Sequence, residues 1–234
     1  MNVAIIAAAG QGARMGSKRA KQFLELDGVP VIIHTLQRFQ DCADIDQVVV
    51  VLPEKDVKRF PALARKHGLT KVTNCIAGGN TRGQSVKLGL DSISQEVSIV
   101  AVHDGVRPFV TPDEISRTIE AARRERAAIL VAPVTDTIKF LSKEKESVGT
   151  TLTRRSLCRA LTPQCFQYKT LRDAFKNSAW RKHPEFFTDE SMLLERKMKV
   201  AVVEGNPRNI KITTPEDIGM AEIILKRDRE FRIR

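Results

Sequence analysis

A short basic segment near the N-terminus carries the residues best suited to hold a polyanion. Gly10, Gly12, Arg14 and Lys21 follow an apolar run at residues 3–6. Glycine lets the backbone approach a ligand closely, and arginine or lysine beside backbone N–H groups binds phosphate oxygens. The segment therefore predicts a site for a nucleoside triphosphate. From these residues alone, a tight strand-to-helix turn with solvated charges is the alternative.

The spacing disfavours the two commoner glycine-rich phosphate loops. A dinucleotide-binding loop needs glycine at its first, third and sixth positions, and after Gly10 and Gly12 the sixth position is Met15. A Walker A loop ends in Gly-Lys-Ser/Thr, whereas this chain has Gly16 followed by serine and then lysine. The pattern therefore disfavours both an NAD-dependent dehydrogenase and a P-loop NTPase.

Two later loops also carry residues suited to a nucleotide. Residues 78–85 contain Gly79 and Ser85, and residues 103–108 contain Asp104 and Arg107 beside His103. Each has a structural alternative: a helix cap for the first loop, and an Asx turn with a buried imidazole for the second. Taken singly, neither loop indicates a function.

The elements that must position these loops alternate between strands and helices. Continuous apolar runs predict strands at residues 2–9, 47–52, 71–77, 98–102 and 128–134. Helices are expected from Pro30, over 54–67, after the loop at 78–85 and over 112–126. This order predicts an α/β, Rossmann-like fold with a mostly parallel twisted sheet and helices on both faces. The loops at the carboxyl ends of the strands should meet on one rim.

The alternation stops after residue 134. Residues 137–140 and 150–154 predict a hairpin whose charged tip, 142–147, is unsuited to a core. Further helices are expected over 169–179, 190–197 and 215–227, and strands over 198–203 and 209–212. We expect one domain, residues 1–234, with a projecting β-arm at about 136–156.

Composition limits the class of partner. The net charge of +11 and the pI of about 9.8 favour anionic ligands, but one Trp and one Tyr offer little stacking surface for nucleic acid. No apolar run is long enough to span a membrane. Four cysteines without a C-x-x-C pair predict neither disulfides nor a metal site. We expect a cytoplasmic protein that binds neither nucleic acid nor membrane.

Taken together, the motifs resemble the 2-C-methyl-D-erythritol 4-phosphate cytidylyltransferase family of the non-mevalonate isoprenoid pathway, over about residues 2–227. The matching segments, in chain order, are Gly10 to Met15, Lys21 to Phe23, Gly78-Gly79, Arg82, Ser85-Val86, His103-Asp104, Arg107-Pro108, Ala132 to Thr137, Ala160 to Gln164, Thr188 to Glu190 and Asn209 to Lys211. Two positions depart from the family pattern. Ala20 stands where proline is usual, and Gly105-Val106 replaces a common Ala-Ala pair.

The resemblance implies transfer of a cytidylyl group from CTP to methylerythritol 4-phosphate, with release of pyrophosphate. The implied catalytic residues are Arg14, Lys21 and Lys211. The implied nucleotide-binding residues are Ala8, Ala9, Gly10, Gly12, Gly79, Ser85, Asp104 and Gly105. The implied substrate-binding residues are Arg107, Thr137, Arg154, Thr162 and Thr188. It also implies Mg²⁺ held mainly by the CTP phosphates, and a homodimer in which the arm completes the neighbour's site.

Two other functions stay open at this point. A sister cytidylyltransferase acting on ribitol 5-phosphate shares the nucleotide loops and differs only on the sugar side. A nucleotide- or RNA-binding module could keep the fold without the chemistry, although binding alone would not need Arg14, Lys21 and Lys211 together.

Overall fold

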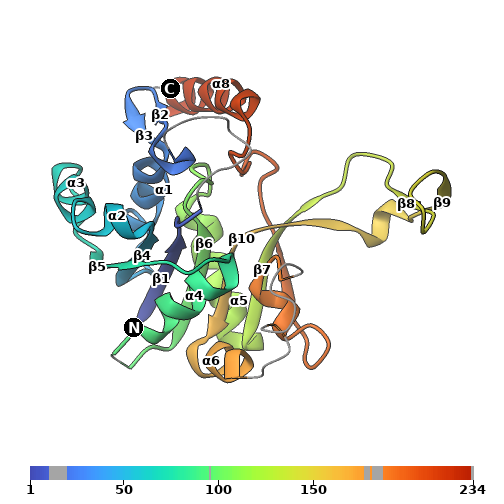
Figure 1. The fold of residues 1–234 in the computed structure, drawn as a ribbon, viewed down its shortest axis with the longest axis horizontal. Coiled ribbons are helices and arrows are strands. Elements are labelled where there is room, and N and C mark those ends of the chain that lie inside the picture. Colours follow the sequence, from blue (N-terminus) through green and yellow to red (C-terminus); the bar gives the residue numbers. More distant parts are fainter. Residues whose placement is uncertain (11–19, 95, 177–179, 181–186, 233–234) are drawn as a thin grey trace.

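A seven-stranded sheet forms the centre of the computed structural model, which describes residues 1–10, 20–94, 96–176, 180 and 187–232. The strand order is β11-β7-β10-β6-β1-β4-β5 (Figure 1). The strands are β1 (Asn2–Ala7), β4 (Gln47–Leu52), β5 (Val72–Ala77), β6 (Ile99–Asp104), β7 (Ala127–Pro133), β10 (Cys158–Gln167) and β11 (Ala201–Glu204). Only β10 runs antiparallel to its neighbours among these strands. The predicted mostly parallel α/β sheet is confirmed.

Helices cover both faces of this sheet, as predicted. The apolar cluster on one face includes side chains from α1 (Val31–Gln40), α3 (Phe60–Lys66) and α5 (Pro112–Glu125). The cluster on the other face includes side chains from α4 (Arg82–Asp91) and α6 (Tyr168–Lys176). The valine run of β4 serves both faces, because successive side chains of a strand point in opposite directions.

Smaller elements close the edges of the fold. A third apolar cluster joins α8 (Pro215–Arg232) to the short strand β2 (Glu25–Leu26), which pairs with β3 (Val29–Pro30). In the part of the chain that the structure describes, 3₁₀ turns lie at η2 (Lys21–Phe23), η3 (Arg154–Ser156) and η5 (Glu190–Leu193). No helix in the described part of the chain is both long and apolar enough to cross a membrane.

The helix predicted over residues 54–67 is wrong in one respect. The chain forms two helices there, α2 (Glu54–Val57) and α3, with Pro61 in the first turn of α3. Proline has no N–H to bond the carbonyl four residues earlier, here that of Val57, so a single continuous helix is broken. Gly68 ends the second helix with a positive φ of 68°, as expected for a glycine stop.

Two C-terminal predictions are also wrong. The structure has only the 3₁₀ turn η5 within residues 190–197, because the side-chain oxygen of Gln164 binds the backbone N–H groups of Glu190 and Ser191 and shapes the turn. No strand forms at 209–212. The backbone of that segment instead bonds to the loop after β6, from Ile212 N to the carbonyl of Val106 at 3.0 Å.

Strand β10 was not predicted. Pro163 lies within it, and proline usually marks an edge strand or a break. The pairing of β10 with β7 shifts register between Ala160 and Gln164, so the ladder passes over the residue that cannot donate a hydrogen bond. Before β10 in the chain, the predicted hairpin forms from β8 (Lys139–Leu141) and β9 (Val148–Thr151) and projects from the body of the molecule (Figure 1).

Gly89 allows α4 to lie close to the sheet. A Cβ at this position would stand 2.7 Å from Cγ2 of Ile5 in β1, and 3.2 Å from Cγ2 of Val51 in β4. Both neighbours are buried and β-branched, so they have little room to move. This close approach sets the position of α4, which begins at the rim of the sheet.

We expect Gly89→Ala to lower the free energy of unfolding by about 1 kcal/mol or more, because overpacking outweighs the gain in helix propensity. Gly219→Ala in α8 is the matched control, since a Cβ there meets nothing within 4 Å. The free energy of unfolding of the control variant should rise by up to about 1 kcal/mol. Urea unfolding measures the free energy of unfolding of both variants. An equal rise in the two would show that the space beside Gly89 can accommodate a methyl group.

Candidate active site

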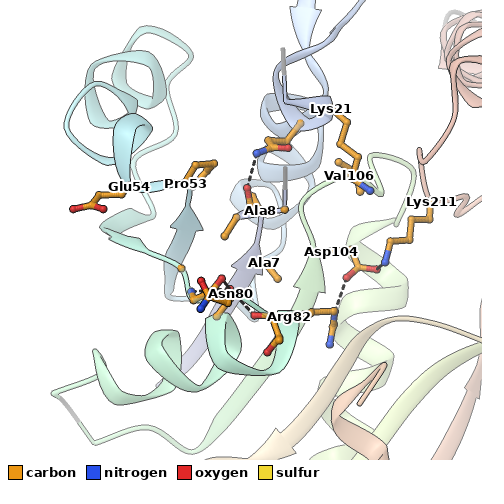
Figure 2. Close-up of a pocket in the computed structure, with 17 residues that line it drawn as sticks. Ala7, Ala8, Lys21, Pro53, Glu54, Asn80, Arg82, Asp104, Val106 and Lys211 are labelled. Carbon is orange, nitrogen blue, oxygen red and sulfur yellow. Dashed lines mark hydrogen bonds and ion pairs between the residues drawn. The ribbon is translucent and has the colours of Figure 1, made fainter. Parts of the chain in front are cut away.

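Loops that follow four parallel strands meet in a cavity of about 580 Å³ at the carboxyl edge of the sheet (Figure 2). The cavity, called the larger cavity below, is lined by loops at the ends of these strands and by three further residues. The lining comprises residues 7–10 at the end of β1, Pro53 and Glu54 after β4, residues 78–82 and Ser85 after β5, Asp104 and Val106 at the end of β6, and Lys21, Gln22 and Lys211. The prediction that the strand-end loops share one rim is confirmed for the part of each loop that the structure describes.

Close packing holds the first and second loops together. A Cβ on Gly78 would stand 2.2 Å from that of Ala9, so only glycine lets the two loops touch in this way. The buried side chain of Gln22 donates to the carbonyl of Ala8 at 2.7 Å and ties the segment after the first loop to β1. The Ser85 hydroxyl accepts from the backbone N–H of Gly79 at 3.1 Å. Small residues and backbone groups thus form this wall of the cavity.

Asp104 is the electrostatic centre of the site. Its Oδ1 accepts from Arg82 Nε at 3.0 Å, and its Oδ2 lies 3.1 Å from Arg107 Nε and 3.0 Å from Lys211 Nζ. Figure 2 shows Arg82 and Lys211 reaching it from different sides. Burial opposes ionisation, but the three cations outweigh burial and hold the pKa of Asp104 well below its usual value. Asp104 is therefore a fixed anion surrounded by positive charge.

Arg82 joins Asp104 to a second buried carboxylate. Its Nη1 donates to Oε1 of Glu190 at 2.6 Å, across 108 positions of sequence. Burial opposes the charge on Arg82, yet Glu190 and Asp104 together raise its pKa. Burial raises the pKa of Glu190 although Arg82 partly offsets it, and its Oε2 is buried without a hydrogen-bond partner. The pair holds Arg82 rigidly between two elements.

A smaller cavity of about 210 Å³ adjoins the larger one and shares Arg82, Asp104 and Lys211 with it. Its other lining residues are Arg107, Ala160, Leu161, Thr162, Gln164, Thr188 and Asp189. Arg107 also donates from Nη1 to the carbonyl of Asn209 at 2.9 Å. Cations at the shared wall can therefore face anionic groups in both cavities at once.

His103 lies behind this wall and is fully buried. Its Nε2 is 3.1 Å from the carbonyl oxygen of Arg107, and its Nδ1 is 2.9 Å from the hydroxyl of Thr162. Burial lowers the pKa of His103 to about 3, despite the nearby charge of Asp104. The imidazole is therefore neutral at physiological pH.

The structure brings together most of the residues that sequence analysis proposed. The larger cavity is lined by Ala8, Ala9, Gly10, Lys21, Gly79, Ser85, Asp104 and Lys211, and the smaller one by Arg107, Thr162 and Thr188. Gly105 lies next to the larger cavity, because its backbone N–H donates to the carbonyl of Ala7, a lining residue, at 3.0 Å. Gly12 and Arg14 lie outside the described residues. Thr137 and Arg154 are exposed and line neither cavity.

The sequence alone shows no role for Arg82, Glu190, Gln164 or Asn209, although all four stand within matching motifs. Their contact partners lie far away in the sequence. The motifs could therefore mark these residues but could not show which of them contact one another. Their presence in those motifs was the one signal that could have singled them out. Groups of three or more His, Cys, Asp or Glu side chains able to hold a metal ion are absent from the part of the chain described.

Known proteins match this chain over nearly its whole length. The family model described as 2-C-methyl-D-erythritol 4-phosphate cytidylyltransferase matches residues 2–227. A protein of that name from Syntrophus aciditrophicus is 40% identical over 228 residues, covering 97% of this chain and 96% of the relative. Another from Halalkalibacterium halodurans is 40% identical over 222 residues, covering 94% and 95%.

Solved structures agree with these relatives. The 4-diphosphocytidyl-2C-methyl-D-erythritol synthase of Anaerococcus prevotii superposes with a TM-score of 0.83 at 31% identity, covering 96% of each chain. The 2-C-methyl-D-erythritol 4-phosphate cytidylyltransferase of Thermus thermophilus has a TM-score of 0.74 at 32% identity, covering 95% of this chain and 98% of that one.

The buried histidine predicts a pH dependence of stability. Its folded pKa of about 3 lies below the value of about 6.5 expected when unfolded, so the unfolded chain takes up the proton first. Its contribution is full above pH 6.5 and falls as the pH drops, by up to about 1.4 kcal/mol per pH unit.

Urea unfolding at pH 7.5, 6 and 5 should show wild type losing stability faster than His103→Asn, which cannot titrate there. The other histidines are common to both proteins and cancel in the difference. Parallel curves for the two proteins would contradict the buried neutral imidazole.

Proposed function

The chain belongs to the family of 2-C-methyl-D-erythritol 4-phosphate cytidylyltransferases, and we propose how its own residues carry out the family's reaction. It is a nucleotidyltransferase that moves a cytidylyl group from CTP to 2-C-methyl-D-erythritol 4-phosphate in the non-mevalonate isoprenoid pathway. The products are 4-diphosphocytidyl-2-C-methyl-D-erythritol and pyrophosphate. The observation that carries the proposal is the wall of Arg82, Asp104 and Lys211 between two adjoining cavities.

The larger cavity takes CTP in this proposal. Its volume of about 580 Å³ is in the usual range for a ligand site, and its glycine-rich walls let backbone approach the nucleotide. The nucleotide lies against Ala8, Ala9 and Gly10 on one side and Gly79 and Ser85 on the other. Asp104 and Gly105, at the end of β6, meet the ribose.

The smaller cavity takes the sugar phosphate. Arg107 supplies a guanidinium held in place by Asp104, and Thr162 and Thr188 supply hydroxyl groups beside it. Because the two cavities share a wall, the phosphate of one substrate can stand next to the α-phosphate of the other. This juxtaposition is what in-line displacement at phosphorus requires.

Charge stabilisation supplies the catalysis. A phosphate-monoester oxygen is already anionic at neutral pH, so it attacks the α-phosphorus without a general base, and pyrophosphate leaves. Lys211 stands at the shared wall, where its three N–H donors can contact both Asp104 and an α-phosphate oxygen. Lys21 stabilises the same phosphate from the larger cavity, and Arg14 is proposed to join it. His103 takes no part in proton transfer, because it is buried and neutral.

We propose Mg²⁺ as the cofactor. Asp104 is the carboxylate in the shared wall, and three cations already contact it, so it is a poor metal ligand. A magnesium ion held by phosphate oxygens and water fits this donor set better than a protein cage does. Bound in that way, the ion would neutralise part of the triphosphate charge.

The hairpin arm supports a homodimer. Phe140, Leu141 and Val148 expose 64%, 45% and 59% of their surface, which is unusual for large apolar side chains on one hairpin. Thr137 and Arg154 lie on the same arm, away from both cavities of their own chain. In a dimer, each arm would bring these two residues to the neighbour's sugar-phosphate cavity. A cytoplasmic location and the lack of a nucleic-acid partner stay predictions.

We expect Lys21→Ala to reduce turnover about a hundredfold or more, because one charge that stabilises the transition state is lost. Lys66→Ala on α3 is the control, since this exposed lysine lines neither cavity. The assay is pyrophosphate release from CTP with methylerythritol phosphate, and with ribitol 5-phosphate as the rival substrate. Near-normal turnover by folded Lys21→Ala would remove its catalytic role.

A mixture of Lys21→Ala and Arg154→Ala chains tests whether the arm acts in trans. Each heterodimer would hold one intact site, so random pairing of equal amounts should restore about a quarter of wild-type activity. Tagged heterodimers purified away from the two homodimers should keep about half. Purified heterodimers without activity would show that the arm serves its own chain.

A further inference from the structure

We propose that His103 is a positioning residue that fixes Thr162 as a hydrogen-bond acceptor for a hydroxyl of the sugar alcohol. The inference rests on the proposed assignment of the smaller cavity to the sugar phosphate. His103 is a buried group that the transfer reaction itself does not use. The acceptor role of Thr162 also specifies which part of the substrate it recognises.

The tautomer of His103 follows from its two partners. Its Nε2 faces the carbonyl oxygen of Arg107 at 3.1 Å, and a carbonyl can only accept, so Nε2 carries the hydrogen. Nδ1 is then a bare acceptor. The Thr162 hydroxyl, 2.9 Å from Nδ1, must donate its hydrogen to the ring.

The second contact of the Thr162 hydroxyl is equally definite. The backbone N–H of Asp104 donates to Oγ1 of Thr162 at 3.3 Å. A hydroxyl has one hydrogen and two lone pairs, so one lone pair is all that this group can still offer. The backbone of Thr162 is held as well, because its carbonyl accepts from Nδ2 of Asn209 at 2.9 Å. Thr162 therefore presents an acceptor in a fixed place.

An acceptor is the wrong partner for a phosphate and the right one for an alcohol. The oxygens of an ionised phosphate accept hydrogen bonds, and Arg107 with Lys211 can supply donors to them. A sugar hydroxyl has a hydrogen to give. Thr162 thus distinguishes the polyol part of the substrate from its phosphate.

The surroundings of His103 keep this arrangement from reversing. A protonated ring would donate from Nδ1, and the Thr162 hydroxyl would then turn its own hydrogen elsewhere. The ring is fully buried and packs against Phe39 at 4.9 Å between centroids, and that burial lowers its pKa to about 3. The bond to the Arg107 carbonyl and the charge of Asp104 favour protonation of the ring, and the charges of Arg107 and Arg82 oppose it, but burial outweighs these contributions.

Two substitutions separate the two contacts of the ring. His103→Asn places a side-chain oxygen at the same bond distance from the backbone as Nδ1, and so can still accept from Thr162. His103→Gln places an amide N–H where Nε2 was, which keeps the bond to Arg107 but loses the acceptor. His67→Gln, a histidine that lines neither cavity, is the control.

We expect His103→Gln to raise the KM for methylerythritol phosphate about tenfold, the effect of one hydrogen bond, and to leave the KM for CTP unchanged. His103→Asn should stay within about threefold of wild type for both substrates. Equal effects of the two variants, or equal changes in both KM values, would overturn the proposal. A wild-type enzyme without turnover would instead refute the proposed function.

Thr162 variants keep the proposal testable if a His103 variant fails to fold. Thr162→Val should raise the same KM about tenfold, and Thr162→Ser should not. In the Thr162→Val background, His103→Gln should add nothing, whereas a further tenfold loss would show that His103 acts elsewhere. Among monodeoxy analogues of the substrate, one should lose its sensitivity to Thr162→Val. Sensitivity kept by all of them would assign Thr162 to the phosphate and overturn the proposal.

Discussion

The ionised carboxylate of Asp104 is the constraint on which the site depends. Three cations from three segments of the chain converge on it: Arg82 from the start of α4, Arg107 after β6, and Lys211 from the segment before α8. Without that anion, their mutual repulsion in a buried place would push the segments apart. The carboxylate lets a basic protein concentrate positive charge where two polyanionic substrates must meet.

The same arrangement explains why the site needs no proton-transfer group. The reacting oxygen of the sugar phosphate arrives ionised, so the energetic problem is repulsion between substrates and charge growth at phosphorus. Fixed cations address both. Among the described residues, His103 is the histidine beside the two cavities, and it is held neutral and bound on both nitrogens, which suits a structural task rather than acid–base catalysis.

Much of this could be predicted from the sequence, where short-range patterns carry the information. The valine run of β4 and the helix starts next to Pro30 and at Pro112 act through local sterics, and each was placed correctly. The same holds for the glycine loop after β5. Strand β10 could not be predicted, since Pro163 argues against a strand unless the register shift beside it is known. The contact between Arg82 and Glu190 spans 108 positions, and a lone charged residue in a motif does not reveal its distant partner. Contacts between distant segments of the chain decide such features, and these contacts cannot be inferred from a single sequence.

The place of β10 between β6 and β7 has a consequence for the order in which the chain can assemble during synthesis. Strands β6, β1, β4 and β5 are neighbours in the sheet and are all made within the first 104 residues. β7 comes next from the ribosome, but its only partners in the sheet are β10 and β11, which are made later. β7 therefore cannot join the sheet until the arm and then β10 have been synthesised, because β10 lies between β7 and β6. The strand-end loops of the larger cavity can thus form early, whereas Lys211 and most of the lining of the smaller cavity are added only when the last third of the chain has emerged.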